Sequence, residues 1–378
     1  MTISRRRLLK SSIALPSAAL GLAASSSVRA DHDDDDDSVR NSFYTMTNAA
    51  GGNEVVAYRF KRRGRMAGLA ESQRRSTNGQ GAGDGLGSQG ALTLNTDQDA
   101  LFAVNAGSNT VAMLRIRDDG LRPAVIAPSG GQRPIAVTEY DDLVFVLNEG
   151  GTPNISGFVV RGSTLQPLAE STRILPAGSM PAQVSFSPDG NALVVSLRGT
   201  NQLLVYPLSR QIPTGPVVTP SAGMTPFGFA FTNHEVLVVS EASGGASDAS
   251  TVSTYELRDH GPLAVISARV PLMQTAACWV ALSRGSRYAY VTNTGSGSVS
   301  ALRIRSNGVA TLIPGPSGPA IAASPGAPID AATRGRALAV LSGSSTRRVD
   351  LFEIKQSTGA LELIGQAGGL PAGATGIA

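Results

Sequence analysis

The sequence is poor in the residue types that build metal centres and disulfide frameworks. Among 378 residues it has one cysteine, three histidines and one tryptophan. A single cysteine excludes an internal disulfide framework, a four-cysteine zinc site and a c-type haem attachment. Three histidines argue against an imidazole-built copper or zinc centre. We therefore expect no metal and no cofactor.

Charged residues are also scarce, at 16% of the chain, whereas there are 43 glycines and 22 prolines. The hydrophobic content of 42% is typical of a globular protein. Many glycines and prolines with few charges favour short strands and tight turns over long helices. The composition thus favours an all-β protein.

The first thirty residues have the pattern of an export signal. Three arginines at 5–7 and the sequence Leu-Leu-Lys at 8–10 precede a short apolar run over 13–24, and a small-x-small cleavage pattern ends at Ala30. The paired arginines are typical of a twin-arginine (Tat) signal. The apolar run is well short of the roughly 20 residues that span a membrane. We expect residues 1–30 to be a Tat signal peptide, and the mature protein to be periplasmic or secreted, with no integral membrane segment.

Removing this signal changes the charge balance. It holds five of the 32 basic residues and no acid, so the formal net charge falls from +4 to −1. Such a balance gives no support for a nucleic-acid partner. Residues 31–42 follow as an acidic leader with six aspartates. Like charges in a row stay extended, which favours a solvated spacer, and a weak cation- or surface-binding tail is the alternative.

One unit of about 49 residues recurs seven times. Each copy has an apolar strand, a small polar turn, a second apolar strand and a weaker third strand. The copies begin at Phe43, Leu101, Leu143, Leu193, Val236, Tyr288 and Ala337. A further short strand precedes most copies, at residues 90–94, 134–138, 181–186, 226–231, 277–281 and 328–332. Four short strands at this spacing are typical of a β-propeller blade, so we predict an all-β, seven-bladed β-propeller over residues 43–378.

The two ends of this region complement each other. The copy at Phe43 has no inner strand before it, and residues 371–378 read as an inner strand with no blade after it. We predict that the C-terminal inner strand completes the N-terminal blade and closes the ring, which leaves no free radial seam.

Small-molecule sites in this architecture lie where groups from several blades converge. The starts of the innermost strands and the turns between the second and third strands share one face, which we call the funnel face. The candidate ligand-binding residues at these positions are Gln89, Glu149, Gln183, Phe227, Trp279, Asn293 and Asp330. Any of them could instead satisfy strand ends.

Two residues of the funnel face are candidates for catalysis. Glu241 follows an apolar strand and could act as general acid or base, and Arg198 could neutralise a carboxylate or oxyanion. The alternative for Glu241 is a carboxylate bound by turn amides. His234 and His260 fall on outer turns, so no Ser-His-Asp triad is visible, and Cys278 reads as a small buried hydrophobe.

The glycine-rich stretch at residues 78–90 is the other conspicuous segment. It lacks the Lys-Ser/Thr of a P-loop and follows no buried parallel strand, so it is no dinucleotide fingerprint. It could be a flexible flap at the mouth of the funnel or a disordered insertion between blades.

The segments 53–58, 185–190 and 288–293 resemble the seven-bladed lactonase propellers, a family that includes bacterial 6-phosphogluconolactonase and fungal 3-carboxymuconate cyclase. The resemblance covers about residues 43–378. It implies an enzyme that opens or forms a lactone ring, or a protein that binds a small lactone or carboxylate, at the funnel face.

The family's catalytic set is largely missing from this sequence. Its His-Pro-His segment falls on residues 180–182, its Pro-Arg-His segment on 226–228 and its Asn-Arg-Gly turn on 293–295, so histidines and arginines are lost. Glu241 keeps the character of the family's Asn-Glu turn. These losses favour the alternative function, a non-catalytic propeller that binds a ligand or a protein. We expect a monomer in either case.

Overall fold

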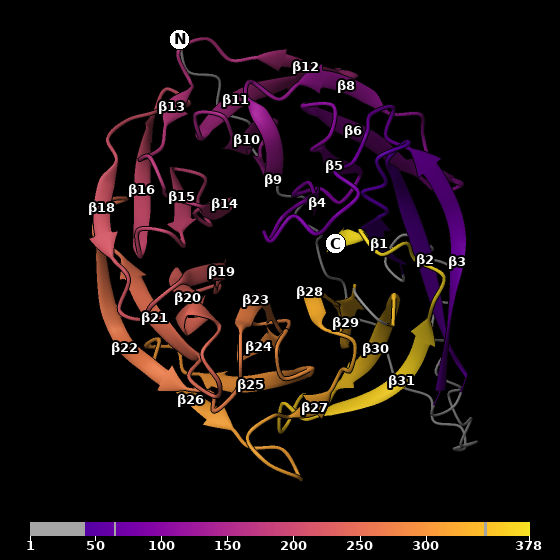
Figure 1. Cartoon of the computed structure of the whole chain (residues 1–378), viewed down its shortest axis with the longest axis vertical. Helices are drawn as coiled ribbons and strands as arrows, with labels where there is room; N and C mark the ends of the chain where they lie inside the picture. The colour runs from indigo at the N-terminus through magenta and orange to yellow at the C-terminus, as the bar shows by residue number, and fades with distance from the viewer. Residues whose placement is uncertain (1–41, 64–65, 344–345) are drawn as a thin grey trace, which may run out of the picture. The chain divides into compact units, whose positions relative to one another are not determined.

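The computed structural model describes residues 42–63, 66–343 and 346–378, which form seven antiparallel sheets arranged in a ring (Figure 1). Within these ranges the helical structure is one short 3-10 turn, η1 (Ser243–Gly245). The predicted all-β, seven-bladed β-propeller is therefore confirmed. The predicted signal peptide and nearly all of the acidic leader lie outside the described residues and stay predictions.

Each sheet forms one blade, with its strands side by side from the axis outwards. The innermost strands, in the order of blades 1 to 7, are β32 (Thr375–Ile377), β4 (Leu92–Leu94), β9 (Gln132–Tyr140), β14 (Pro181–Phe186), β19 (Pro226–Phe231), β23 (Ala277–Leu282) and β28 (Pro328–Arg334). The second strands are β1 (Ser42–Met46), β5 (Ala100–Asn105), β10 (Leu143–Gly150), β15 (Ala192–Leu197), β20 (Val236–Glu241), β24 (Tyr288–Asn293) and β29 (Ala337–Ser342). The third strands are β2 (Glu54–Arg63), β6 (Thr110–Arg117), β11 (Asn154–Arg161), β16 (Gln202–Ser209), β21 (Thr251–Leu257), β25 (Ser298–Ile304) and β30 (Arg348–Ile354). The outer strands are β3 (Met66–Ser76), β7 (Gly120–Leu121), β8 (Val125–Pro128), β12 (Thr164–Pro167), β13 (Arg173–Ile174), β17 (Ile212–Pro213), β18 (Val217–Pro220), β22 (Leu263–Pro271), β26 (Ala310–Ile313), β27 (Ala322–Ala323) and β31 (Leu361–Ala367).

The second strands form the core of the ring. Every residue of β5, β15, β20, β24 and β29 is buried, because each strand is sandwiched between the neighbouring blades. Strands covered on both faces need continuous apolar runs rather than alternation, as these sequences have. The largest apolar cluster extends over blades 1 to 4. No helix among the described residues has the length and apolar character needed to cross a membrane.

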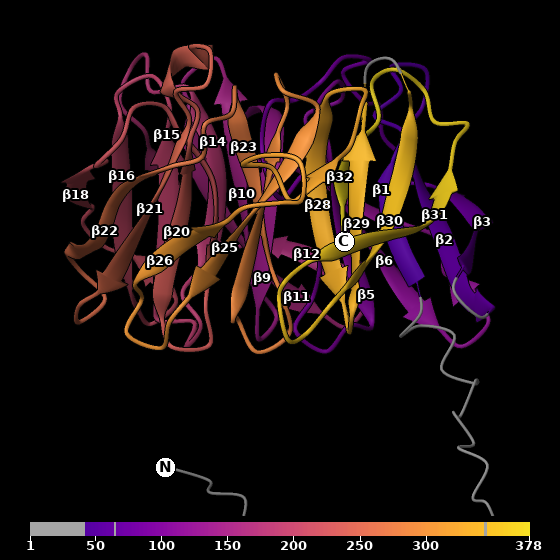
Figure 2. The ribbon, with the colours of Figure 1, turned by 90° about the horizontal axis from the view of Figure 1, so that it is seen from below.

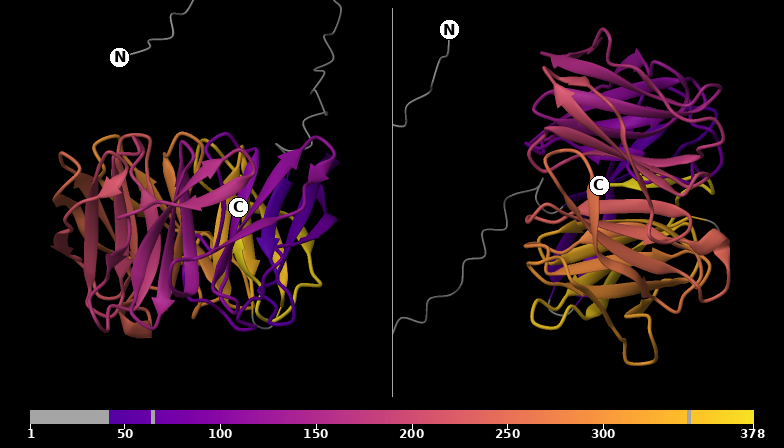
Figure 3. Two further views of the ribbon diagram at one scale, coloured as in Figure 1. Left: turned by 90° about the horizontal axis from the view of Figure 1, so that it is seen from above. Right: turned by 90° about the vertical axis from the view of Figure 1, so that its left-hand side faces the viewer.

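The strands run between two faces of the ring, as the side views show (Figures 2 and 3). The funnel face carries the loops that enter the innermost strands and the turns between second and third strands. The opposite face carries the turns between innermost and second strands. Blade 1 takes its innermost strand from the C-terminus, since β32 pairs with β1 and the Tyr44 and Ala378 backbones exchange hydrogen bonds of 2.8 and 2.9 Å.

Polar side chains of the innermost strands join neighbouring blades. Thr93 Oγ1 donates to the Val137 carbonyl at 2.8 Å, and Gln183 bonds both backbone groups of Phe229, at 2.7 and 3.0 Å. These contacts satisfy backbone groups at the crowded axis. The predicted ligand-binding residue Gln183 thus uses its side-chain amide inside the fold.

Candidate functional site

The glycine-rich segment, residues 78–90, is an ordered part of the ring that we call the plug. Its Leu86 and Ser88 are buried, with 3% and 0% exposure, and Asn48 Nδ2 donates to the Asp84 carbonyl at 2.5 Å. The structure therefore corrects the interpretation as a disordered insertion, and the flap at the mouth of the funnel stays a prediction.

The end of the plug is bonded to inner strands of several blades. Ser88 Oγ donates to the Ile135 carbonyl at 2.7 Å, and the Gln89 N–H donates to the Ala182 carbonyl at 3.0 Å. The Gln89 side chain donates to the Val280 carbonyl at 2.8 Å and accepts its N–H at 3.0 Å. Because these strands belong to blades 3, 4 and 6, the plug closes the axis on the funnel face. Gln89, predicted to bind ligand, is part of this closure.

Glu241, the predicted acid or base, is fully buried, and both of its carboxylate oxygens are bonded. Oε1 accepts the Gly223 N–H at 2.8 Å and lies 3.4 Å from Ser221 Oγ, and Oε2 accepts the Thr251 hydroxyl. These are the contacts of a carboxylate that fastens the loop before β19. The contacts match the structural alternative, and a catalytic role for Glu241 stays an untested prediction.

Asn293 is also fully buried. Its Nδ2 donates to Ser298 Oγ at 3.0 Å and to Ser300 Oγ at 2.9 Å. Since Asn293 pairs with Ala277 as Glu241 pairs with Pro226, the two residues hold equivalent places in blades 6 and 5. The structure places both inside the turns rather than at an open surface.

Arg198, the other predicted catalytic residue, lies on the funnel face beside Glu149. Arg198 Nη2 is 3.2 Å from Glu149 Oε1, and Arg133 Nε is 3.5 Å from Glu149 Oε2. Arg133 also approaches Asp84 of the plug, at 3.5 Å between Nη2 and Oδ1. We call these four residues the arginine cluster. It unites the predicted residues Arg198 and Glu149 and adds Arg133, whose only signal in the sequence is its place directly before the inner strand predicted at residues 134–138.

An aromatic base supports the Arg198 guanidinium. Its central carbon lies 5.0 Å from the centroid of the Phe227 ring, within cation–π range, and the Phe227 and Trp279 rings pack at 5.0 Å. Trp279 Nε1 donates to the Ser88 carbonyl at 2.8 Å. Burial lowers the pKa of Arg198, and the Glu149 charge opposes that shift. The predicted ligand-binding residues Phe227 and Trp279 are only 6% and 4% exposed. They support the arginine cluster from beneath.

A cavity of about 450 Å³ adjoins the arginine cluster, between blades 3 and 4. Glu149 stands at its wall, and apolar side chains line much of the rest, among them Ile174 and Met180, which are 63% and 53% exposed. A charged pair beside an apolar hollow is the usual form of a small-molecule site.

Asp330 lies on the axis, in a separate cavity of about 630 Å³ that Gln89 and Gln183 also line. Its oxygens accept the Ala331 N–H at 2.8 Å and the Ile377 N–H at 3.2 Å. Burial raises the pKa of Asp330 well above 3.8, although these hydrogen bonds act in the opposite direction. Residues of the opposite face line the mouth of this cavity, so Asp330 is apart from the arginine cluster.

The remaining nucleophile and base candidates are peripheral or inert. His234 lies in the turn before the second strand β20, and His260 lies in the turn after the third strand β21. Both turns are on the opposite face of the ring from the funnel face. His260 Nε2 is 3.5 Å from Asp189 Oδ2. Cys278 is 7% exposed, and burial raises its pKa to about 11. Among the described residues no group of three or more His, Cys, Asp or Glu side chains could hold a metal ion.

No protein-family model matches the chain, and no curated protein matches it. Solved structures do match. The periplasmic gluconolactonase of Pseudomonas aeruginosa gives a TM-score of 0.66 at 16% identity, over 88% of this chain and 98% of that one. A provisionally assigned 6-phosphogluconolactonase of Bacteroides uniformis gives the same TM-score, identity and coverage. A Lactobacillus plantarum protein gives 0.67 at 16% identity, over 89% and 98%. At these identities the likeness shows the fold, and the predicted resemblance to lactonase propellers is confirmed at that level.

Proposed function

We propose that this lactonase-like propeller binds a small organic carboxylate at the arginine cluster of its funnel face, and that binding rather than turnover is its role. The observation that carries the proposal is the held guanidinium of Arg198. It rests on Phe227, its Nη2 bonds Glu149, its Nε donates to the Met180 carbonyl at 3.3 Å, and its Nη1 makes no hydrogen bond to any described residue.

A guanidinium fixed in this way is preorganised for an oxyanion. Carboxylates are recognised by the planar array of N–H donors that arginine presents, and an aromatic face below keeps that plane in place. The cavity of about 450 Å³ beside Glu149 offers space for the body of the ligand. The ligand would lie off the axis, because the plug occupies the axis on this face.

Acid–base catalysis has weaker support. Both oxygens of Glu241 are bonded within the fold, and both oxygens of Glu149 face guanidinium groups. The second candidate function is lactone ring opening or closure, which the fold shared with the Pseudomonas aeruginosa gluconolactonase favours. In that case Glu149, whose side chain is 23% exposed, would be the base and Arg198 its partner.

Thermal shifts with a panel of hydroxy acids and dicarboxylates test the binding function. A ligand at 100 times its Kd should stabilise the protein by about 2.7 kcal/mol. Arg198→Gln should remove the part of the shift that the arginine cluster contributes, and Arg305→Gln, which removes an exposed arginine from the opposite face, should retain the full shift. A panel in which no carboxylate stabilises the protein would contradict the proposal.

Lactone assays on the same preparations separate the two functions. Absence of turnover together with a ligand-dependent shift supports a binding protein. Turnover that Glu149→Gln abolishes, while Arg305→Gln leaves it unchanged, supports the enzyme.

We also propose that the chain is exported by the Tat pathway to the periplasm or beyond. The arginines at positions 5 and 6 followed by Leu8 and Leu9 support this proposal. Replacing both arginines, as Arg5→Lys with Arg6→Lys, should leave the precursor in the cytoplasm. Continued export of that variant would contradict the Tat route.

A further inference from the structure

The cavity on the axis is separated from the arginine cluster by the plug. It has about 630 Å³ and is lined by innermost strands and by turns of the opposite face. This volume is in the range of small-molecule sites. At its mouth, Arg334 ends β28 and also lines an adjoining cavity of about 700 Å³.

Arg334 has no anionic partner among the described residues. Its Nη1 donates to Gln98 Oε1 at 2.5 Å, but its Nη2 is buried and has no hydrogen-bond partner within the described part of the chain. No carboxylate of the described ring forms an ion pair with it. Burial lowers the pKa of Arg334, with Tyr44 opposing the shift. A buried N–H donor of a charged group that lacks an acceptor is costly, so the fold holds Arg334 in a state that an external acceptor would relieve.

The surroundings of Arg334 add positive charge. Arg284 and Arg336 line the adjoining cavity with it. The carboxylate there, Glu353, already pairs with Lys355 at 2.7 Å. Among the residues that line the axial cavity the side-chain carboxyl is that of Asp330, four residues earlier on β28 and thus about 13 Å away along the strand. The charged side chains around Arg334 are therefore mainly cationic.

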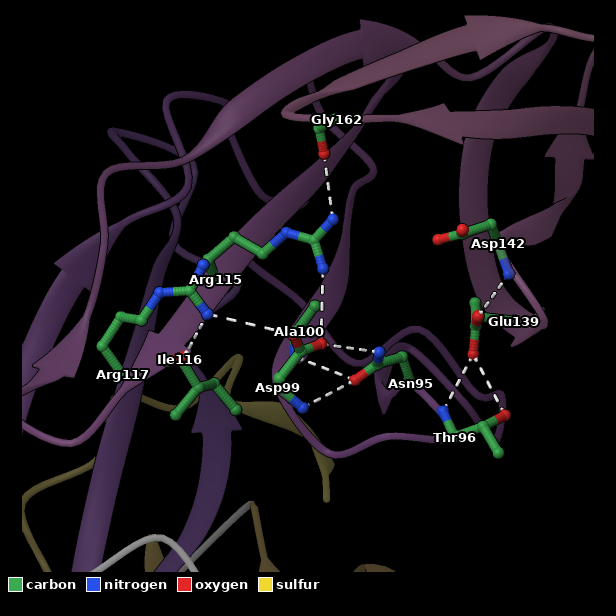
Figure 4. Close-up of polar contacts among 10 residues, drawn as sticks. All are labelled: Asn95, Thr96, Asp99, Ala100, Arg115, Ile116, Arg117, Glu139, Asp142 and Gly162. Carbon is green, nitrogen blue, oxygen red and sulfur yellow. Dashed lines mark hydrogen bonds and ion pairs between the residues drawn. The ribbon is translucent and has the colours of Figure 1, made fainter. Parts of the chain in front are cut away.

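Gln98 belongs to the turn over residues 95–100, and Figure 4 shows the contacts of Asn95 and Asp99 in this turn. Asn95 Oδ1 accepts the Asp99 and Ala100 N–H groups at 2.9 and 2.8 Å, and Asp99 pairs with Arg115 at 3.3 Å. Gln98 is left with a side-chain amide nitrogen that makes no hydrogen bond to the described residues. Gln98 is thus positioned before any ligand arrives, which favours affinity.

We propose that Arg334 and Gln98 form an anion-binding site at the mouth of the axial cavity. The ligand is a small organic anion whose carboxylate or phosphate accepts a hydrogen bond from Gln98 Nε2 and, after rotation of the guanidinium towards the cavity, a second one from Arg334 Nη2. Its hydroxyl-bearing body lies in the cavity, where Thr93 Oγ1, already donating to a carbonyl, keeps acceptor capacity for it. This site is on the other side of the plug from Arg198 and is independent of the function proposed there.

Calorimetric titration of the full chain with inorganic phosphate and with malonate tests the site. The titrations use the Arg198→Gln background at constant ionic strength, so that the funnel face does not contribute. At least one anion should bind, and Arg334→Met should weaken it more than 10-fold. Gln98→Ala should weaken it severalfold, and Arg305→Gln should leave it unchanged. If only one of the two anions binds, the result shows whether the site prefers a phosphate or a carboxylate.

Thermal melting tests whether a loss of anion binding in Arg334→Met is caused by misfolding. Since Arg334→Met removes an unpaired buried guanidinium, the variant should melt at the same or a higher temperature while losing the anion-induced shift. The proposal is overturned if neither anion binds, if Arg334→Met binds as well as its parent, or if Arg305→Gln weakens binding equally.

Discussion

Glu149 and Glu241 each lie at the end of an apolar second strand, but they occupy different positions in their blades. Pro134 pairs with Asn148 in blade 3, and Pro226 pairs with Glu241 in blade 5. Glu241 is therefore the equivalent of Asn148, a fully buried turn residue, and Glu149 is one position further along. Because side chains alternate along a strand, one residue of register decides whether a carboxylate serves the turn or the surface.

The structural role of Glu241 predicts a loss of stability on substitution. Glu241→Gln replaces one acceptor oxygen by a donor that faces the Gly223 N–H or the Thr251 hydroxyl. We expect the free energy of unfolding in urea to fall by about 1–3 kcal/mol. Glu149→Gln, which removes partly exposed ion pairs, should cost less than about 1 kcal/mol. Wild-type stability of Glu241→Gln would show that the buried contacts are dispensable.

Asp330 predicts a pH dependence of stability. Because its pKa is raised by burial, the folded state keeps a proton that the unfolded state releases above about pH 4. The unfolded state then binds fewer protons, so this residue lowers the free energy of unfolding as pH rises. Asp330→Asn cannot titrate. Its stability relative to wild type, measured by urea unfolding, should increase as pH rises above about 4. Stability curves of the two proteins that stay parallel with pH would contradict the prediction.

At the scale of elements, the plug depends on close backbone approach. A Cβ at Gly81 would lie 2.1 Å from the carbonyl carbon of Asn48, whereas a Cβ at Gly85 would meet nothing within 4 Å. Gly81→Ala should therefore lower the free energy of unfolding by about 1–3 kcal/mol. Gly85→Ala is the matched control and should be neutral or slightly stabilising. Equal effects of the two substitutions would show that the plug tolerates displacement.

The strands were predictable because their pattern is local and repeated. Residues 181–186 and 226–231 match β14 and β19 to the residue, and both segments start at a proline and carry apolar runs. The backbone conformation at the entry to the innermost strands was not predictable. Arg133, Met180 and Thr225 adopt left-handed backbone conformations there, with φ of 49°, 45° and 59°. None of these three residues is the glycine or asparagine that this conformation favours.

The candidate site shows the same limit. Arg198 and Glu149 could be placed on the funnel face from the repeat, because each lies in the predicted turn between the second and third strands of its blade. The packing of the plug could not be predicted in this way. Gly81 and Gly85 look alike in the sequence, although only Gly81 lies against the Asn48 backbone. Long-range contacts such as that of Gln89 with Val280 leave no periodic trace.

At the scale of the whole molecule, the chain termini of the ring meet in one blade. In β32, Thr375 and Ile377 are buried, and Thr45 Oγ1 donates to the Gly376 carbonyl at 2.6 Å. Deleting residues 371–378 should remove these contacts and lower the melting temperature of the entire ring, with an expected loss of more than about 3 kcal/mol. If the truncated protein melts unchanged, the closure has no stabilising role.

Trp279 gives the ring a natural spectroscopic reporter. It is the only tryptophan in the sequence, it is 4% exposed, and its indole nitrogen bonds the Ser88 carbonyl of the plug. Withdrawal of residues 78–90 from the axis would admit water to this one fluorophore and shift its emission to longer wavelengths. Opening of the axis can therefore be followed in the unlabelled protein, separately from unfolding of the strands as seen by circular dichroism.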